Sequence, residues 1–169
     1  SRPSIPVHII PGNHDPLTPD SVYHDPSWEG APNVTVHKTC DPVCLEGLGT
    51  TLHPCPVREK RSLKDPTASI TVEDDGLIHV GIAHGNLDIA YGEKDNDFPI
   101  PPDVAEKRGL SYLALGHWHS TLLMPETGAT RVAYSGSPET TKFGERDSGN
   151  VLVVEIASST SDPVVRKVP

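Results

Sequence analysis

Short runs of apolar and β-branched residues, separated by turn residues, form the dominant pattern of this chain. Such runs, bounded by Gly, Pro, Asn or Asp, predict short strands. Val and Ile together outnumber Leu, which also favours strands over helices. The predicted strands lie at residues 5–10, 34–37, 43–46, 50–54, 78–83, 112–115, 121–124, 132–134, 151–156 and 164–168.

Helices are expected at only two places, Pro66–Glu73 and Pro102–Arg108, and the second has Gly109 as its stop. Three prolines between residues 16 and 26 exclude a long helix before Asn33. The polar segment Asp88–Pro102 is expected to be a loop. The pattern therefore predicts a strand-rich α/β fold, with stacked mixed β-sheets and outer helices.

Length and charge narrow the range of functions. The 169 residues fit one domain, and no apolar run approaches the roughly 20 residues that cross a bilayer. A formal net charge of -9 argues against a broad nucleic-acid-binding surface, although a metal-centred site for phosphates remains compatible with it. A cluster of basic residues is formed by Arg58, Lys60, Arg61 and Lys64. We expect it to be a solvated loop, with contact to the substrate as the alternative.

The cysteines Cys40, Cys44 and Cys55 do not form an even set for disulfide pairing. We expect free thiols and a reducing, cytoplasmic setting. A structural zinc site with His37 and His53 is the alternative, but the spacing matches no zinc motif.

Polar side chains follow three of the predicted strands. A Gly-Asn-His-Asp motif occupies residues 12–15, His84 follows the strand at 78–83, and a Gly-His-Trp-His motif occupies residues 116–119. Each motif alone is explained by a polar turn. Loops at strand ends, however, often carry reactive groups, and imidazole and amide oxygen ligands suit Mn, Fe or Zn. Together the motifs predict a site with two metals about 3.5–4 Å apart that acts on phosphoryl groups.

In this order, the three motifs resemble those of the calcineurin-like metallophosphoesterases. Residues 15–34, 56–60 and 134–143 add a similarity to the SbcD-type DNA repair exonucleases within that family. The resemblance covers nearly the whole chain and implies an αββα sandwich. It also implies a metal-dependent phosphodiesterase, with DNA as the first candidate substrate and a coiled-coil ATPase, of the kind that SbcD-type nucleases use, as a candidate partner.

The resemblance also assigns roles to residues. Asn13, His84 and His117 would bind one divalent metal and His119 the other, with Mn²⁺ expected first and Fe²⁺ or Zn²⁺ as alternatives. His14 would face the phosphate and protonate the leaving oxygen or stabilise the transition state. Asp15 would orient His14 or stabilise its turn, and Ser135 and Ser137 would line the site.

Two further motifs of the family, Asp-x-His and Gly-Asp, do not occur before Asn13. Residues 1–169 are therefore expected to be the C-terminal part of one metallophosphoesterase domain, which alone binds metal weakly and hydrolyses phosphoesters poorly. A missing N-terminal segment would supply the other ligands. The alternatives are a small-substrate phosphatase or nucleotide phosphodiesterase, and a non-catalytic half-domain of a heteromeric assembly.

Overall fold

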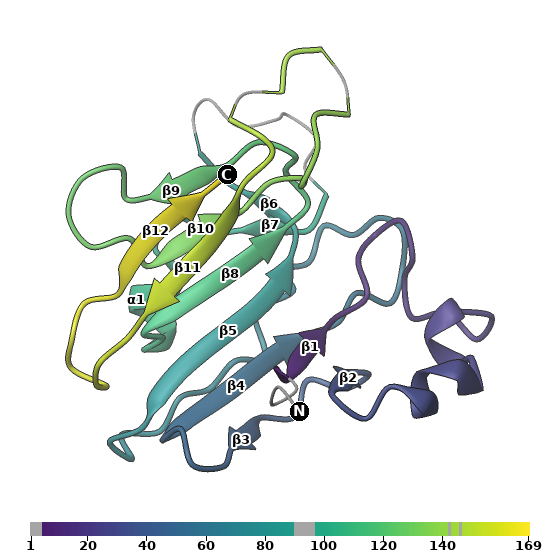
Figure 1. The fold of residues 1–169 in the computed structure, drawn as a ribbon, viewed down its shortest axis with the longest axis horizontal. Coiled ribbons are helices and arrows are strands. Elements are labelled where there is room, and N and C mark those ends of the chain that lie inside the picture. The colour runs from purple at the N-terminus through teal and green to yellow at the C-terminus, as the bar shows by residue number, and fades with distance from the viewer. Residues whose placement is uncertain (1–4, 90–96, 142, 146) are drawn as a thin grey trace.

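The computed structural model describes residues 5–89, 97–141, 143–145 and 147–169 (Figure 1). Its strands are β1 (Val7–Ile9), β2 (Val34–Val36), β3 (Val43–Leu45), β4 (Thr50–Cys55), β5 (Ile78–His84), β6 (Asn86–Leu87), β7 (Pro99–Ile100), β8 (Tyr112–Gly116), β9 (Leu122–Met124), β10 (Val132–Tyr134), β11 (Val151–Glu155) and β12 (Val164–Val168). Its helices are the 3-10 helices η1 (Val22–His24) and η2 (Pro26–Gly30) and the α-helix α1 (Val104–Arg108).

A six-stranded mixed sheet forms the centre of the fold, in the order β3-β4-β5-β8-β10-β9. The four inner strands are parallel, and the edge strands β3 and β9 are antiparallel to their neighbours. Parallel pairing brings the carboxyl ends of β5, β8 and β10 to the same edge. His84 at the end of β5 is paired in register with Gly116 at the end of β8. The motifs that follow these strands are therefore neighbours.

Other elements cover the two faces of this sheet. On one face the β11–β12 hairpin lies over β8 and β10 (Figure 1), and Leu152 and Val154 approach Tyr112, Ala114 and Ala133 there. The short parallel pair β1–β2 lies near β4 in the same view. On the other face α1 packs its buried side against the sheet. The layered, strand-rich arrangement with few helices confirms the α/β class, whereas the αββα sandwich stays a prediction.

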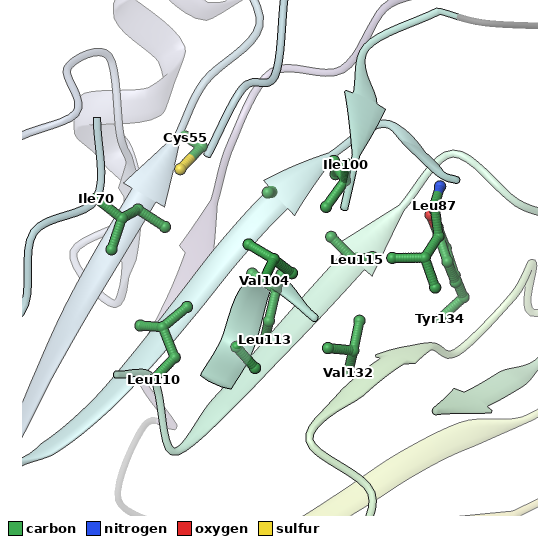
Figure 2. Packing of buried hydrophobic residues seen from close by; sticks show 12 residues of the cluster. Cys55, Ile70, Leu87, Ile100, Val104, Leu110, Leu113, Leu115, Val132 and Tyr134 are labelled. Carbon is green, nitrogen blue, oxygen red and sulfur yellow. The ribbon is translucent and has the colours of Figure 1, made fainter. Parts of the chain in front are cut away.

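The core lies between α1 and the sheet (Figure 2). Leu113 of β8 and Val104 of α1 are almost fully buried, and so are Leu87 and Ile100 of the pair β6–β7. Gly81 of β5 lies close to Leu113. A larger residue at this position would crowd it, because a Cβ there would lie 2.7 Å from Cδ1 of Leu113. Close packing under the middle of the sheet holds β5 and β8 rigid up to the ends where the candidate site begins.

The predicted strands are all present, with ends shifted by a few residues, and α1 confirms the second predicted helix. Gly109 ends α1 in a left-handed conformation, with φ of 73°. The helix predicted at 66–73 is wrong. There the Asp65 carboxylate accepts hydrogen bonds from the Thr67 N–H at 2.8 Å and the Thr67 hydroxyl at 2.6 Å, which forms a turn instead.

The loop predicted at Asp88–Pro102 is wrong at its end, because Pro99 and Ile100 form β7. The Asp88 N–H donates to the Ile100 carbonyl at 2.9 Å, and burial of the Ile100 side chain stabilises this pairing. Residues 90–96 of that loop lie outside the described residues. The two short 3-10 helices were not predicted; each begins at a side-chain cap, Ser21 or Asp25. Within the part of the chain that the structure describes, no helix is long and apolar enough to span a membrane.

Candidate metal-binding and catalytic site

One pocket of about 620 Å³ lies at the edge where β5, β8 and β10 end. It brings together every predicted site residue except Asp15. Those that line it are Asn13, His14, His84, His117, His119, Ser135 and Ser137. Residues from four separate loops therefore share one concave surface, which is the usual form of a binding or catalytic site.

His84 is the centre of this arrangement. Its Nε2 lies 2.8 Å from Oδ1 of Asn13, although the two residues are 71 positions apart in sequence. The His84 and His117 rings meet edge to face, with centroids 5.3 Å apart. Two imidazoles and one amide oxygen thus converge from the three motifs.

Two glycines make room for the His84 ring. A Cβ on Gly12 would lie 2.8 Å from Cε1 of His84, and a Cβ on Gly116 would lie 2.9 Å from its Nδ1. The tight fit leaves the His84 residue half-buried. Burial, together with the neighbouring His117 imidazole, lowers the pKa of His84 to about 4. At neutral pH the ring is uncharged, as metal binding by imidazole requires.

Asp15 supports the Asn13-His14 turn from outside the pocket. Its carboxylate accepts a 3.0 Å hydrogen bond from the Gly12 N–H and another from the Tyr23 hydroxyl. Burial and this hydrogen bond raise the pKa of Tyr23 to about 12, so Tyr23 remains a donor. Of the two roles expected for Asp15, these contacts match stabilisation of the turn.

His119 is held by a partner that the sequence did not indicate. Its Nδ1 lies 2.7 Å from Oε1 of Glu145, and the Glu145 side chain is only 2% exposed. A carboxylate on one ring nitrogen fixes the tautomer and orientation of an imidazole and is typical of metal-binding histidines. Glu145 lies outside the recognised motifs and 26 residues beyond His119, so no sequence signal marked it.

The segment with Ser135 and Ser137 packs directly on the Gly-His-Trp-His loop. The Ser137 N–H donates to the His119 carbonyl at 2.9 Å. Gly136 between the serines has φ of 77°, and a Cβ there would lie 2.7 Å from the same carbonyl oxygen. Only glycine tolerates both conditions, so this segment is built to form the pocket wall beside His119.

Trp118 and Tyr134, which lie in the recognised segments but were given no role from the sequence, connect the loops that carry His84 and His117. Their rings stack with centroids 5.1 Å apart, and the indole N–H of Trp118 donates to Oδ1 of Asn86 at 2.7 Å. The buried Tyr134 hydroxyl donates to the Gly85 carbonyl at 2.7 Å and accepts from the Leu87 N–H at 2.9 Å. This cluster fixes the path of the chain just after His84.

We expect Tyr134→Phe to lower the free energy of unfolding by about 1–3 kcal/mol, because two buried backbone groups lose their partner. Urea unfolding measures this change. Tyr112→Phe is the matched control, since Tyr112 is also buried but its hydroxyl makes no hydrogen bond to the described residues. Equal losses in both variants would contradict the role assigned to the Tyr134 hydroxyl.

The donor set of Asn13, His84 and His117 fits part of a metal site. Among the described residues, no group of three or more His, Cys, Asp or Glu side chains is placed to hold a metal ion. The cluster of Asn13, His84 and His117 offers ligands suited to a borderline divalent metal but no carboxylate. All three cysteines are free; Cys55 is buried, which raises its pKa to about 12.

No protein-family model matches this chain, and no curated protein matches it.

Proposed function

We propose that this pocket is part of the active site of a metal-dependent phosphoester hydrolase, a phosphodiesterase that acts on DNA ends. One observation carries the proposal: three motifs far apart in the sequence meet in a single pocket. There the Asn13 amide oxygen and the His84 and His117 imidazoles converge, and His14 and His119 line the same pocket.

In this proposal Asn13, His84 and His117 hold one divalent metal, and His119, oriented by Glu145, contributes to a second. Mn²⁺ is the expected ion, with Fe²⁺ or Zn²⁺ as alternatives. When bound, such ions polarise phosphoryl oxygens and make water a stronger nucleophile.

His14 is the proposed proton donor. It lines the pocket next to Asn13, and the Asp15 carboxylate fixes the turn that presents it. An imidazole can donate a proton to a leaving oxygen near neutral pH, which makes histidine the commonest general acid of enzymes. Ser135 and Ser137 add hydroxyl groups to the pocket beside His119, where they would hydrogen-bond the substrate.

The absence of a carboxylate from the donor set supports a second part of the proposal. A segment with Asp-x-His and Gly-Asp motifs, on the same or another polypeptide, would supply the anionic ligands and complete the two-metal site. An ATPase partner of the kind used by SbcD-type nucleases belongs to this proposal. The net charge of -9 favours one alternative substrate, a small phosphoester or nucleotide.

A titration with Mn²⁺, followed by NMR, tests the proposed metal site. Paramagnetic broadening is expected first at the Asn13 side-chain amide and the His84 and His117 rings. We expect His84→Ala to weaken Mn²⁺ binding about tenfold or more, because it removes a ligand. His24→Ala, at an exposed histidine outside the pocket, is the control. Broadening that spreads over surface carboxylates and is unchanged in His84→Ala would refute the proposal.

A further inference from the structure

The basic cluster of the sequence divides into two parts in the structure. The Arg58 side chain lies outside the pocket and binds the backbone of another segment: its Nη2 donates to the Lys38 carbonyl at 2.7 Å. Lys60 and Arg61 instead line the pocket that holds the histidines. The expected solvated loop thus places two of its cations beside the candidate active site.

The segment that carries Lys60 and Arg61 is fixed on both sides. Before it, the Val57 N–H donates to the Pro11 carbonyl at 3.1 Å, and the Val57 carbonyl accepts from the Leu17 N–H at 2.8 Å. After it, the Ser62 carbonyl accepts from the Phe98 N–H at 2.7 Å. The two Val57 bonds tie the segment to the loop that contains Asn13 and His14, so the backbone that carries the two cations has a defined position relative to the site.

Among the described residues, each of the two cations has only a weak interaction with a carboxylate. The Arg61 side chain is 87% exposed, and its Nε lies 3.9 Å from Oδ2 of Asp97, a long contact that contributes little in water. Lys60 has no carboxylate within 4 Å among the described residues; its interaction with the exposed Asp20 carboxylate is the smallest of the causes that lower the pKa of Asp20. Asp97 is the only carboxylate among the described lining residues, in a chain whose net charge is -9.

We propose that Lys60 and Arg61 bind a second phosphate group of the substrate, next to the phosphate that reacts. The inference rests on the proposed hydrolase function and specifies its substrate as one with at least two phosphate groups. The planar Arg61 guanidinium can hold two phosphate oxygens, and the Lys60 ammonium adds a point charge. A pocket of about 620 Å³ has room for more than a single phosphate.

Two substrates share this chemistry, a nucleic-acid strand and a polyphosphate chain. The probes are a fluorescein-labelled oligothymidylate, followed by anisotropy, and inorganic tripolyphosphate, followed by calorimetry. Both measurements use the 169-residue chain in EDTA without added metal. Binding by the cations is thereby separated from metal binding and hydrolysis, so this inference can fail while the proposed function holds, and the reverse.

The test variant is Lys60→Gln with Arg61→Gln, and the control is Arg58→Gln with Lys64→Gln. Each pair changes the net charge by the same two units, from -9 to -11, but the control residues lie outside the pocket. We expect the test variant to weaken binding of at least one probe about tenfold. For the oligonucleotide, the slope of log K against log salt should become less steep by about 1.4, for two lost phosphate contacts.

The outcome identifies the source of the second phosphate. Loss confined to oligothymidylate indicates a nucleic-acid strand, and loss confined to tripolyphosphate indicates a polyphosphate chain. The inference is overturned if the wild-type chain binds neither probe. It is also overturned if the test and control variants lose affinity equally, because the effect would then come from net charge alone.

Discussion

Joining this chain to a segment that carries Asp-x-His and Gly-Asp motifs is expected to raise its phosphodiesterase rate by about 10³-fold or more. This is the scale on which enzymes lose kcat when a group that stabilises transition-state charge is removed. The isolated chain offers Asn13, His84 and His117 to a metal, but the described part of the pocket supplies no carboxylate to that cluster. Neutral ligands alone leave the charge of a divalent ion uncompensated, so it binds weakly.

Hydrolysis of a bis-aryl phosphodiester in the presence of Mn²⁺ measures the effect, with the chain alone, the segment alone and the two co-expressed. A segment whose Asp-x-His aspartate is replaced by Ala is the matched control and should restore little activity. His14→Ala in the active combination should lower kcat by about 10²–10⁴-fold, as expected for loss of a general acid. Turnover by the isolated chain at a typical enzyme rate of about 1–10³ s⁻¹ would contradict the prediction.

Stability is expected to fall steeply as the pH drops below about 6.5, because the fold buries histidines in uncharged form. His53 is 3% exposed, and its Nε2 lies 2.9 Å from Nδ1 of His79. Burial, with a smaller contribution from His79, lowers the pKa of His53, although Asp75 opposes the shift. Burial and the stacked His8 ring likewise lower the pKa of His37.

The direction in which the free energy of unfolding changes with pH follows from proton binding. Between the ordinary pKa of 6.5 and the lower pKa of the folded state, the unfolded chain binds more protons than the folded chain. The free energy of unfolding therefore decreases as the pH falls through this window, by up to about 1.4 kcal/mol per pH unit for each histidine. Above this window, at pH 7.5, neither residue contributes to the slope.

Urea unfolding in EDTA at several values between pH 7.5 and pH 5 measures this dependence. His53→Gln should flatten the slope, because the glutamine does not titrate. His24→Gln, at an exposed histidine, is the control and should keep the wild-type slope. Stability that stays constant or increases toward pH 5 would show that these buried rings are not kept neutral by the fold.

Local sequence patterns predicted the strands well because short runs of apolar and β-branched residues favour strands, even where the strand is largely exposed, as in β12. Apolar runs such as Ile78–Ala83 have few other stable environments, and β5 occupies that run. The pattern was less reliable where a side chain competed with the backbone. At residues 66–73 the Asp65 carboxylate formed a turn, and at Pro99–Ile100 a short parallel pairing depended on the distant residues Asn86 and Leu87.

The candidate site shows the same division. The sequence marked Asn13, His84 and His117 because three motifs with these side chains occur in order, each just after a predicted strand. No local signal marked Glu145, and none gave Tyr134 a role, because each acts through a contact with a residue far away in the chain. The sequence showed a basic cluster but not where it lies in the fold. The structure places Lys60 and Arg61, but not Arg58, at the pocket.

By itself the sequence determined which strands form and which polar residues follow them, since burial and turn chemistry act over a few residues. Only the tertiary structure decided that His84 meets Asn13 across 71 positions. It also decided that two glycines leave room for the His84 ring and that the described donor set contains no carboxylate. The physical reason is that the parallel order of β5, β8 and β10 brings their carboxyl ends together, and such pairing is a long-range property.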